Sequence, residues 1–473
     1  VASAIIEKQR LSQFIQLIMN IPAPEIFKAY DIRGLVDKEL TPDFAFATGI
    51  AVARFLEQER EPGTVVIGED MRPSSPTLAT AFAAGVTSQG LDVIRIGLAS
   101  TDMLYFASGK LNLPGAMFTA SHNPAEYNGI KLCLSGARPI GKESGLVVIE
   151  NYVRDGAPMA MRNVGVEKQQ SMLADYVDHL LTLVDVSAIR PLKIVIDAGN
   201  GMGGYTAPAV FERLNAEVVE LYFELDGTFP NHEANPIEPA NLVDLQKAVK
   251  KHKADIGLAF DGDADRCFLV DEKGALVNPS ALTALIATRE LAKNPGASII
   301  YNLISSRAVK EVVEENGGTA IRSRVGHSYI KKQMAETNAV FGGEHSAHYY
   351  FRDFWGADNG MLAALHLISE LGTFQGSMSE LSNSFSPYFS SGEINSTVSD
   401  VPAAIDRLKH AFPDCKVEQF DGYTFSFGDK ENWFWFNVRS SNTEPLLRLN
   451  VESNHEASME KIRDQAIAVI RNG

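Results

Sequence analysis

The sequence predicts an α/β protein with three mixed α/β domains and a C-terminal α+β domain. Short β-rich runs alternate with helical stretches of about ten residues or more, which is typical of parallel sheets built from βαβ units. The last part of the chain instead alternates apolar and polar residues, as antiparallel strands do. The chain has 473 residues, of which 45% are hydrophobic and 22% charged. At roughly 150 residues per domain, this suits three or four globular domains and excludes a disordered or fibrous protein.

The elements follow from hydrophobic periodicity and turn residues. The predicted strands, in chain order, are residues 65–67, 93–96, 116–119, 193–197, 255–260, 298–302, 339–341, 420–427 and 433–438. The predicted helices are residues 76–89, 169–186 and 456–471.

Three stretches divide the chain into domains. The helical stretch at 169–186 precedes a new strand, and residues 274–279 are rich in turn formers. Residues 384–396 are polar and are interrupted by Pro and Gly. The charges near residue 10 and the lack of a cleavage site argue against a targeting segment at the start. The predicted organisation is an N-terminal extension at residues 1–23, followed by domains at 24–170, 171–273, 274–387 and 388–473.

Charge and cysteine content exclude several functional classes. The chain has 43 basic and 59 acidic residues and a formal net charge of −16, whereas nucleic-acid binding needs clustered positive charge. We therefore expect no nucleic-acid partner, although local cations or a metal could attract an anionic small molecule into a cleft. No run of about 18 apolar residues is present to span a membrane. Three scattered cysteines are typical of a reduced, cytoplasmic protein.

A serine-containing loop follows the strand at 116–119. It reads Thr-Ala-Ser-His-Asn-Pro, and loops at the carboxyl ends of strands in open α/β sheets are where ligands bind. Ser121 is the candidate nucleophile. We expect His122 to be a poor base for it, because neighbouring side chains on an extended chain point apart. The alternative is an ordinary polar turn ended by Pro124.

Three carboxylates follow the strand at 255–260. Asp261, Asp263 and Asp265 occupy every second position, so a loop that wraps around one point brings their oxygens together, and oxygen ligands suit Mg²⁺ or Ca²⁺. The EF-hand pattern fails, because Glu272 at its final position lacks the flanking helices. The alternative is a solvated acidic turn, which repulsion between three like charges disfavours.

Two further polar loops are candidates for ligand binding. The first contains Glu344, Ser346 and His348, which could bind sugar hydroxyls, and His348 could move a proton near neutral pH. The second begins at Arg439 and could cradle a phosphate. The alternatives are a capping loop and a polar hairpin turn. The single basic residues outside these loops, each of which we expect to be solvated when taken alone, are Lys28, Arg33, Arg72 and Lys131.

Taken together and in this order, these loops resemble those of the α-D-phosphohexomutase family, which interconverts hexose 6-phosphates and 1-phosphates. The resemblance spans residues 24 to 470 approximately, and the motifs TASHNP and DGDADR are highly specific for it. It implies four domains around a deep central cleft. It also implies that Ser121 is carried as a phosphoserine, whose phosphoryl oxygen binds Mg²⁺ together with Asp261, Asp263 and Asp265.

The resemblance assigns roles to further residues. Those implied around the transferring phosphoryl group and the substrate are Tyr30, Arg33, Lys131, Arg266, His327 and His348, with Lys131 or His348 as the general base. Those implied for the sugar hydroxyls are Glu344 and Ser346. Those implied for the distal phosphate are Arg439, Ser441, Asn442 and Thr443. Hexose 1,6-bisphosphate is the implied intermediate and activator.

The sugar loop GEHSAH distinguishes subgroups of the family. His345 stands where phosphomannomutase/phosphoglucomutase members usually have Met and phosphoglucosamine mutases have Gln, and the opening FKAYDIRG is most like that of bacterial phosphomannomutases. We therefore predict a Mg²⁺-dependent phosphomannomutase, monomeric or homodimeric. The alternatives are a phosphoglucomutase or dual-specificity mutase and, more distantly, a phosphoglucosamine mutase. A serine phosphatase and an inactive sugar-phosphate-binding paralogue are rivals from other classes.

One departure from the family concerns residues 301–304. Many relatives carry a basic residue there that contacts the substrate, and this chain has none before Arg307. Arg307 or Lys310 could substitute for it.

Overall fold

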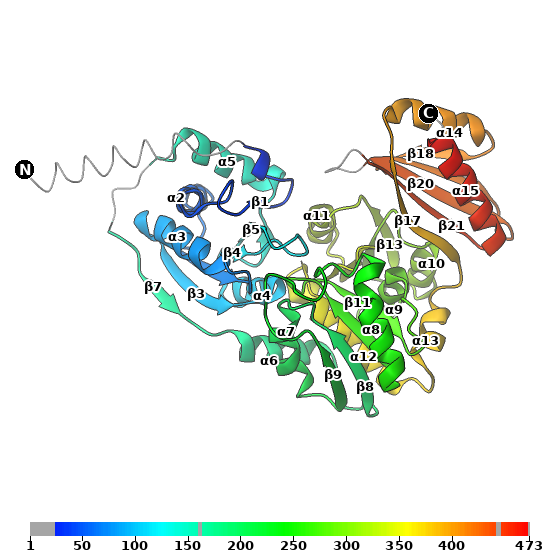
Figure 1. Cartoon of the computed structure of the whole chain (residues 1–473), viewed down its shortest axis with the longest axis horizontal. Helices are drawn as coiled ribbons and strands as arrows, with labels where there is room; N and C mark the ends of the chain where they lie inside the picture. Colours follow the sequence, from blue (N-terminus) through cyan, green and yellow to red (C-terminus); the bar gives the residue numbers. More distant parts are fainter. Residues whose placement is uncertain (1–23, 159–162, 441–445, 472–473) are drawn as a thin grey trace, which may run out of the picture. The chain divides into compact units, whose positions relative to one another are not determined.

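The computed structural model describes residues 24–158, 163–440 and 446–471, and Figure 1 shows the arrangement of its elements. The chain forms two compact units. The first comprises the described residues up to Leu276 together with Ser346–Met378, and the second comprises Val277–His345 together with the described residues from Ser379 onward. The extension predicted at residues 1–23 lies outside the described residues.

A mixed sheet in the first unit carries the serine loop. Its strand order is β1-β5-β4-β2-β3-β7, with β6 beside β5. β2 pairs in parallel with β3 and β4, and β5 runs antiparallel to β4 and β1. The strands are β1 Ile32–Leu35, β2 Thr64–Glu69, β3 Asp92–Leu98, β4 Gly115–Phe118, β5 Tyr127–Leu134, β6 Arg138–Pro139 and β7 Glu167–Gln169.

Four helices of the described chain pack against this sheet and bury its apolar residues. α2 (Pro42–Gln58), α3 (Ser75–Ser88) and α5 (Leu146–Asp155) share one core with the sheet, in which Phe82 meets Phe118 edge-on at 5.4 Å. α4 (Thr101–Leu111) packs against β2 and β4 (Figure 1). The elements predicted within residues 65–119 are confirmed to within about two residues, which is the usual uncertainty of element ends. The helix predicted at 169–186 is shorter, because residues 167–169 form β7 and the helix spans only residues 173–183.

The acidic loop belongs to a second mixed sheet of the first unit. Its order is β11-β10-β8-β9; β10 is parallel to β8 and antiparallel to β11. The acidic loop therefore turns the chain back at the carboxyl end of β10. The strands are β8 Leu192–Asp197, β9 Ala216–Leu221, β10 Ile256–Phe260 and β11 Cys267–Asp271, and β15 Tyr349–Phe351 pairs with β16 Ala357–Asp358 in the same unit. The helices are α6 Leu173–Leu183, α7 Gly203–Phe211, α8 Val243–His252 and α12 Gly360–Thr373.

The second unit begins with three parallel strands. β12 (Ser298–Asn302) pairs with β13 (Thr319–Ser323) and with β14 (Phe341–Gly343). The strand predicted at 339–341 is shifted, because β14 runs on through two glycines that β-propensity disfavours. Glycine is needed there, since a Cβ on Gly343 would stand 2.4 Å from Thr283 Oγ1. The helices are α9 Pro279–Lys293, α10 Arg307–Glu315, α11 His327–Thr337 and, across the division between the units, α13 Met378–Ser384.

The C-terminal part is the predicted α+β domain. Its antiparallel sheet has the order β17-β21-β20-β19-β18. Two helices cover one face (Figure 1), where Phe425 stacks on Phe436 at 4.5 Å. The elements are β17 Phe389–Thr397, α14 Val401–Ala411, β18 Lys416–Gln419, β19 Tyr423–Gly428, β20 Trp433–Ser440, β21 Leu446–Ser453 and α15 Glu456–Arg471.

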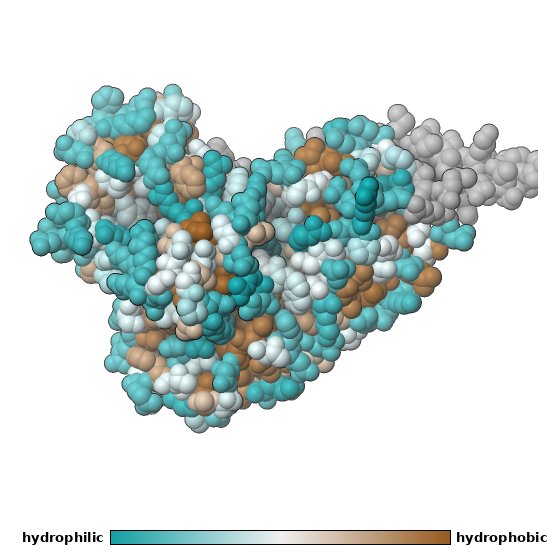
Figure 2. All heavy atoms as spheres, turned by 180° about the vertical axis from the view of Figure 1, so that it is seen from behind, coloured by the Kyte–Doolittle hydropathy of each residue, from teal (hydrophilic) through white to brown (hydrophobic). Residues whose placement is uncertain are grey.

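The surface agrees with the charged composition. Figure 2 shows mostly hydrophilic side chains on one face, with hydrophobic residues in small groups. Cys133, Cys267 and Cys415 are free thiols. Within the described ranges, no helix combines the length and the apolar character that crossing a membrane requires. The architecture is the predicted one of mixed α/β domains and a final α+β domain, and the domain boundaries drawn from turn composition stay predictions.

Candidate active site

The serine loop begins where β4 ends and turns back at Ser121. The Ser121 backbone has a φ of 51°, and its N–H donates to Thr119 Oγ1 at 2.9 Å. This turn buries Ser121 and directs its hydroxyl toward the acidic loop, where Oγ donates to Asp261 Oδ2 at 2.9 Å. Gly262 permits the approach, because a Cβ there would stand 2.3 Å from the Ser121 carbonyl oxygen. A serine with positive φ is uncommon and strained, so its surroundings must hold the loop.

The prediction that the His122 side chain stands apart from Ser121 is wrong. Ser121 Oγ lies 3.2 Å from His122 Nδ1, because the left-handed turn joins two neighbours that an extended chain would separate. The Arg266 guanidinium also contacts this Nδ1. Burial, together with the charges of Arg266 and Arg33, holds the pKa of His122 well below its usual range. His122 is thus a poor base, but the reason differs from the predicted one: its Nδ1 already faces the guanidinium of Arg266.

Arg72 holds the serine loop from inside, contrary to the expectation that it is solvated. Its side chain is fully buried and lies 3.3 Å from the Asp70 carboxylate. Its guanidinium donates to four backbone carbonyl oxygens, which belong to Ser121 (3.0 Å), Asn123 (2.7 Å), Pro124 (2.9 Å) and Tyr127 (2.9 Å). The available signal was its position just beyond a predicted strand, at the carboxyl edge of the sheet where ligand-binding loops gather.

The three aspartates of the acidic loop converge as predicted. Asp261, Asp263 and Asp265 are buried, and each offers a carboxylate oxygen within 4.8 Å of the others. Ala264, with a φ of 61°, turns the loop between the last two. In the part of the chain that the structure describes, the Oδ1 atoms of Asp263 and Asp265 are buried without a hydrogen-bond partner. Buried, unsatisfied carboxylate oxygens at this spacing fit a hard divalent cation such as Mg²⁺.

Two cations partly offset the charge of this cluster. Lys131 Nζ lies 2.6 Å from Asp263 Oδ2 and 2.7 Å from Asp265 Oδ2, and Arg266 Nε donates to Asp261 Oδ2 at 2.8 Å. Burial opposes the charge on Lys131, but the two aspartates outweigh it and raise the pKa of Lys131 well above its usual range. Burial raises the pKa of Asp261 to about 7 in spite of Arg266. The pKa of Asp263 is lowered, because Lys131 and hydrogen bonds outweigh its burial.

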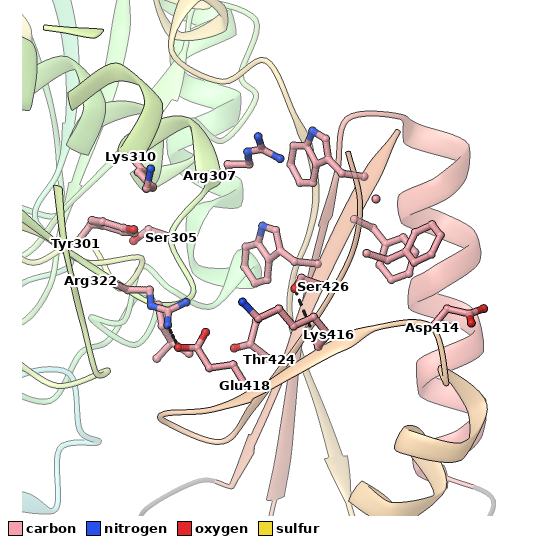
Figure 3. A pocket seen from close by; sticks show the side chains of 16 residues that line it. Tyr301, Ser305, Arg307, Lys310, Arg322, Asp414, Lys416, Glu418, Thr424 and Ser426 are labelled. Carbon is pink, nitrogen blue, oxygen red and sulfur yellow. Dashed lines mark hydrogen bonds and ion pairs between the residues drawn. The ribbon is translucent and has the colours of Figure 1, made fainter. Parts of the chain in front are cut away.

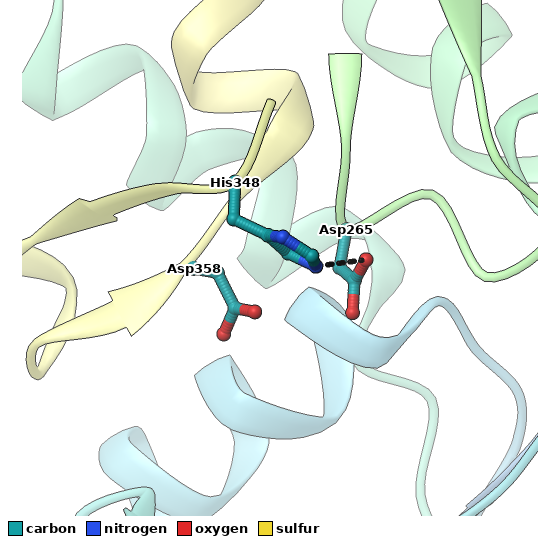
Figure 4. A group of neighbouring side chains, drawn as sticks. All are labelled: Asp265, His348 and Asp358. Atoms are coloured by element: carbon teal, nitrogen blue, oxygen red, sulfur yellow. Dashed lines mark ion pairs between the residues drawn. The ribbon is translucent and has the colours of Figure 1, made fainter. Parts of the chain in front are cut away.

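His348 lies beside Asp265 of the acidic cluster, as Figure 4 shows. An isolated antiparallel bridge joins it to Arg266, and its Nε2 is 3.6 Å from Asp265 Oδ1. Its other ring nitrogen, Nδ1, is 3.1 Å from Ser346 Oγ. The buried carboxylate of Asp358 completes a group whose polar atoms all lie within 4.8 Å of one another. The sequence singled out His348 and Ser346 but missed Asp358, which no motif marked.

Arg33 contacts the serine loop, and Tyr30 precedes Arg33 in the chain. Arg33 stands on β1 and donates to Asn123 Oδ1 at 2.5 Å and to Asp31 Oδ2 at 2.5 Å. Tyr30 is half-buried in the bend before β1. Ser121, Lys131, Arg266, His348 and Arg33 are thus brought together within the first unit.

The residues predicted for the sugar and the distal phosphate belong largely to the second unit. The buried Glu344 accepts from the Gly326 backbone N–H at 3.1 Å. Arg439 is buried and pairs with Glu393 of β17 at 2.6 Å, and Arg448 lies 3.3 Å from the same carboxylate. His327 begins α11. The predicted residues that lie outside the described part are Ser441, Asn442, Thr443 and the side chain of His327.

His345 packs toward the C-terminal domain. It lines a small cavity with Trp435 and Glu452, and burial lowers its pKa, with Arg439 adding to the effect and Glu393 opposing it. Its Nδ1 is buried and finds no hydrogen-bond partner among the residues that are described. The effect of His345 on sugar preference stays a prediction.

The carboxyl end of β12 opens onto a cavity of about 560 Å³ between this strand and the C-terminal sheet (Figure 3). Arg307 and Lys310, the residues considered as substitutes for the missing basic contact, both line it. Arg307 pairs with Glu311 at 2.7 Å and stacks over the Trp433 ring at 4.6 Å. Lys310 pairs with an acidic neighbour on its own helix. Whether either residue reaches substrate stays a prediction.

Four family models match consecutive parts of this chain. They describe the alpha/beta/alpha domains I, II and III and the C-terminal domain of phosphoglucomutase/phosphomannomutase, and they match residues 24–157, 174–274, 278–388 and 393–469.

Similar proteins cover nearly the whole chain. A protein of Xanthomonas campestris pv. campestris named "Phosphohexose mutases" is 42% identical over 461 residues, which are 96% of this chain and 100% of that protein. A phosphomannomutase of Salmonella montevideo is 41% identical over 459 residues, covering 94% of this chain and 98% of its own. The crystal structure of a phosphoglucomutase/phosphomannomutase family protein from Burkholderia thailandensis has a TM-score of 0.86 and 33% identity, and the match covers 95% of this chain and 98% of that one.

Proposed function

This chain belongs to the phosphoglucomutase/phosphomannomutase family and is a phosphohexomutase, and from this premise we propose that it is a Mg²⁺-dependent phosphomannomutase. It interconverts mannose 6-phosphate and mannose 1-phosphate through a phosphoserine at Ser121 and a hexose 1,6-bisphosphate. The observation that carries the proposal is the hydroxyl of Ser121, which is hydrogen-bonded to Asp261 inside the buried acidic cluster. A structural serine needs no such surroundings. A phosphoserine needs positive charge beside it, and here Lys131, Arg266 and a cation held by the three aspartates would supply that charge.

The reaction uses this chain's residues in two symmetrical halves. Phosphorylated Ser121 gives its phosphoryl group to the free O1 or O6 of the sugar phosphate, so the Ser121 Oγ–P bond breaks and a sugar O–P bond forms. The bisphosphate then returns its other phosphoryl group to Ser121. Mg²⁺ held by Asp261, Asp263 and Asp265 would neutralise charge on the transferring phosphoryl group, where most phosphoryl-transfer catalysis lies.

Lys131 and His348 take different parts in this proposal. The raised pKa of Lys131 keeps its ammonium charged, so Lys131 suits neutralisation of phosphoryl oxygens better than removal of a proton. His348, beside Asp265 and Ser346, is the better candidate to take the proton of the attacking sugar hydroxyl. Arg266 and Arg33 supply further positive charge around the phosphoryl group.

Substrate binding is assigned to the remaining predicted residues. Glu344 and Ser346 bind sugar hydroxyls that mannose and glucose share. Arg439 binds the distal phosphate, because a guanidinium makes short, charge-assisted hydrogen bonds to phosphate. The other residues that we assign to substrate are Tyr30, His327, Ser441, Asn442 and Thr443. The three free thiols favour a reducing compartment, and we place the protein in the cytoplasm on that ground.

Phosphorus NMR of mannose 1-phosphate incubated with enzyme, Mg²⁺ and a trace of mannose 1,6-bisphosphate, which phosphorylates Ser121 at the outset, tests the proposal. We expect mannose 6-phosphate to accumulate to equilibrium without free phosphate. Free phosphate alone would identify a phosphatase, and an unchanged spectrum an inactive binding protein. Parallel runs with glucose and glucosamine phosphates test the sugar. Similar specificity constants for mannose and glucose would replace the phosphomannomutase proposal with a dual-specificity mutase.

A further inference from the structure

The first residue of α4 touches the acidic loop at two points. Thr101 is fully buried, its hydroxyl donates to Asp263 Oδ2 at 2.5 Å, and its backbone N–H donates to the Asp263 carbonyl oxygen at 3.0 Å. The two residues are 162 positions apart in the sequence. One residue therefore ties both the main chain and the side chain of Asp263 to the start of a helix in the neighbouring sheet domain.

The two carboxylate oxygens of Asp263 have different surroundings. Oδ2 accepts from Thr101 and from Lys131. Oδ1 is buried and, within the described ranges, accepts no hydrogen bond. A carboxylate held through one oxygen presents the other in a fixed direction, which is how neighbours of metal ligands commonly act.

We propose that Thr101 is a positioning residue that fixes the rotation of the Asp263 carboxylate, so that Oδ1 is presented to the bound cation. The inference rests on the proposed function, in which Asp263 is a ligand of Mg²⁺. Thr101 does not itself touch the cation or the substrate.

Lys131 alone does not fix this rotation. Its ammonium is shared between Asp263 and Asp265, and a lysine is a compact charge on a flexible stem that follows either partner. The hydroxyl of Thr101 sits on a β-branched side chain with few rotamers, on a backbone that is itself bonded to Asp263. The positive end of the α4 dipole further favours a carboxylate at this position.

The start of α4 is itself held firmly. Ser100 caps the helix by accepting from the Met103 N–H at 3.3 Å, and Asp102 Oδ1 accepts from the same N–H at 2.8 Å. The Tyr176 hydroxyl donates to Asp102 Oδ2 at 2.6 Å, which fastens the helix start to α6. Thr101 therefore offers its hydroxyl from a rigid support, as positioning requires.

Thr101→Val tests the proposal, because it removes the hydroxyl and keeps the shape. The readout is binding of Mn²⁺ to the purified full chain, followed by electron paramagnetic resonance, with Mg²⁺ as competitor. We expect Thr101→Val to weaken cation binding about 10- to 100-fold, as loss of an outer-shell partner commonly does. Thr101→Ser, which keeps the hydroxyl, should bind within about threefold of wild type on the same scale.

Thr48→Val is the matched control. Thr48 is also fully buried, in the second turn of α2, and its hydroxyl donates to the Phe44 carbonyl oxygen at 2.8 Å. Melting temperatures of both valine variants measure the structural cost of losing a buried hydroxyl, and only Thr101→Val should change cation affinity.

Asp263→Asn separates failure of this inference from failure of the proposed function. If it loses binding while Thr101→Val binds like wild type, the positioning role is refuted and the ligand role stands. If Asp263→Asn binds like wild type, the proposed metal site is wrong and the inference falls with it. A loss in Thr101→Ser as large as that in Thr101→Val would show that the hydroxyl alone does not preserve cation binding, and it would also refute the proposal.

Discussion

Arg72 is the residue whose removal should harm the serine loop most. Arg72→Met keeps much of the side-chain volume but removes the donors to four carbonyl oxygens and the partner of Asp70. Hydrogen bonds from a charged donor contribute about 1.5–3 kcal/mol each. They do not add, because carbonyls of a loosened loop can turn to water. Breaking a buried ion pair on one side costs about 3–5 kcal/mol, and we take this as the expected loss.

Amide hydrogen exchange measures that loss locally, which suits a multidomain chain without a single two-state transition. Amides of residues 119–127 should exchange about two to four orders of magnitude faster in Arg72→Met, since about 1.4 kcal/mol is tenfold. Mutase activity should fall with it, because Ser121 loses the support of its left-handed backbone. Arg72→Lys should show a smaller effect, since an ammonium has three donors but no planar fork.

Arg154→Met is the matched control for this experiment. The Arg154 side chain is 52% exposed and bonds to Asp155 and Asn151 of its own helix, so loop exchange should not change. Wild-type exchange and wild-type turnover in Arg72→Met would refute the view that this guanidinium holds the catalytic loop.

Three further predictions concern the proposed roles. Ser121→Ala should abolish turnover while the melting temperature stays near that of wild type; an alanine variant with full activity would remove Ser121 from the mechanism. Arg439→Ala should lower the specificity constant roughly ten- to 150-fold for 1-phosphates and 6-phosphates alike, since one charge-assisted hydrogen bond contributes about 1.5–3 kcal/mol; a lower melting temperature with normal kinetics would show that Arg439 only braces Glu393. His345→Met should change the ratio of specificity constants for mannose and glucose phosphates, and an unchanged ratio would rule out a tuning role for this position.

The spacing of residues within short sequence segments predicted the parts of the site that lie within one loop. Asp261, Asp263 and Asp265 are spaced so that a single turn brings their carboxylates together, and the sequence shows that spacing directly. Ser121 follows a strand whose apolar run is equally local. The strands of the α/β domains that were predicted, such as β2, β8 and β12, were accessible for the same reason, since a short stretch of sequence shows the alternate or consecutive apolar residues that a strand buries. Strands such as β5, β9, β11 and β13 were not predicted.

Contacts set by strand order could not be predicted in this way. Arg72 reaches Ser121 because β4 lies between β2 and β5, and Thr101 reaches Asp263 because two sheets meet at their loop edges. Neither order nor docking is visible in a sequence window. The misjudged direction of His122 has another cause: a left-handed backbone at a serine, which propensity disfavours and tertiary contacts impose.

The central claim is that Ser121 carries the transferred phosphoryl group. Its most direct test is mass spectrometry of the peptide containing Ser121 after the enzyme is incubated with mannose 1,6-bisphosphate and Mg²⁺. The account predicts one phosphoryl-sized mass increase that maps to Ser121 and disappears when mannose 1-phosphate is added, with bisphosphate formed in equal amount. A phosphoryl group on another residue, or one on Ser121 that mannose 1-phosphate does not remove, would contradict it.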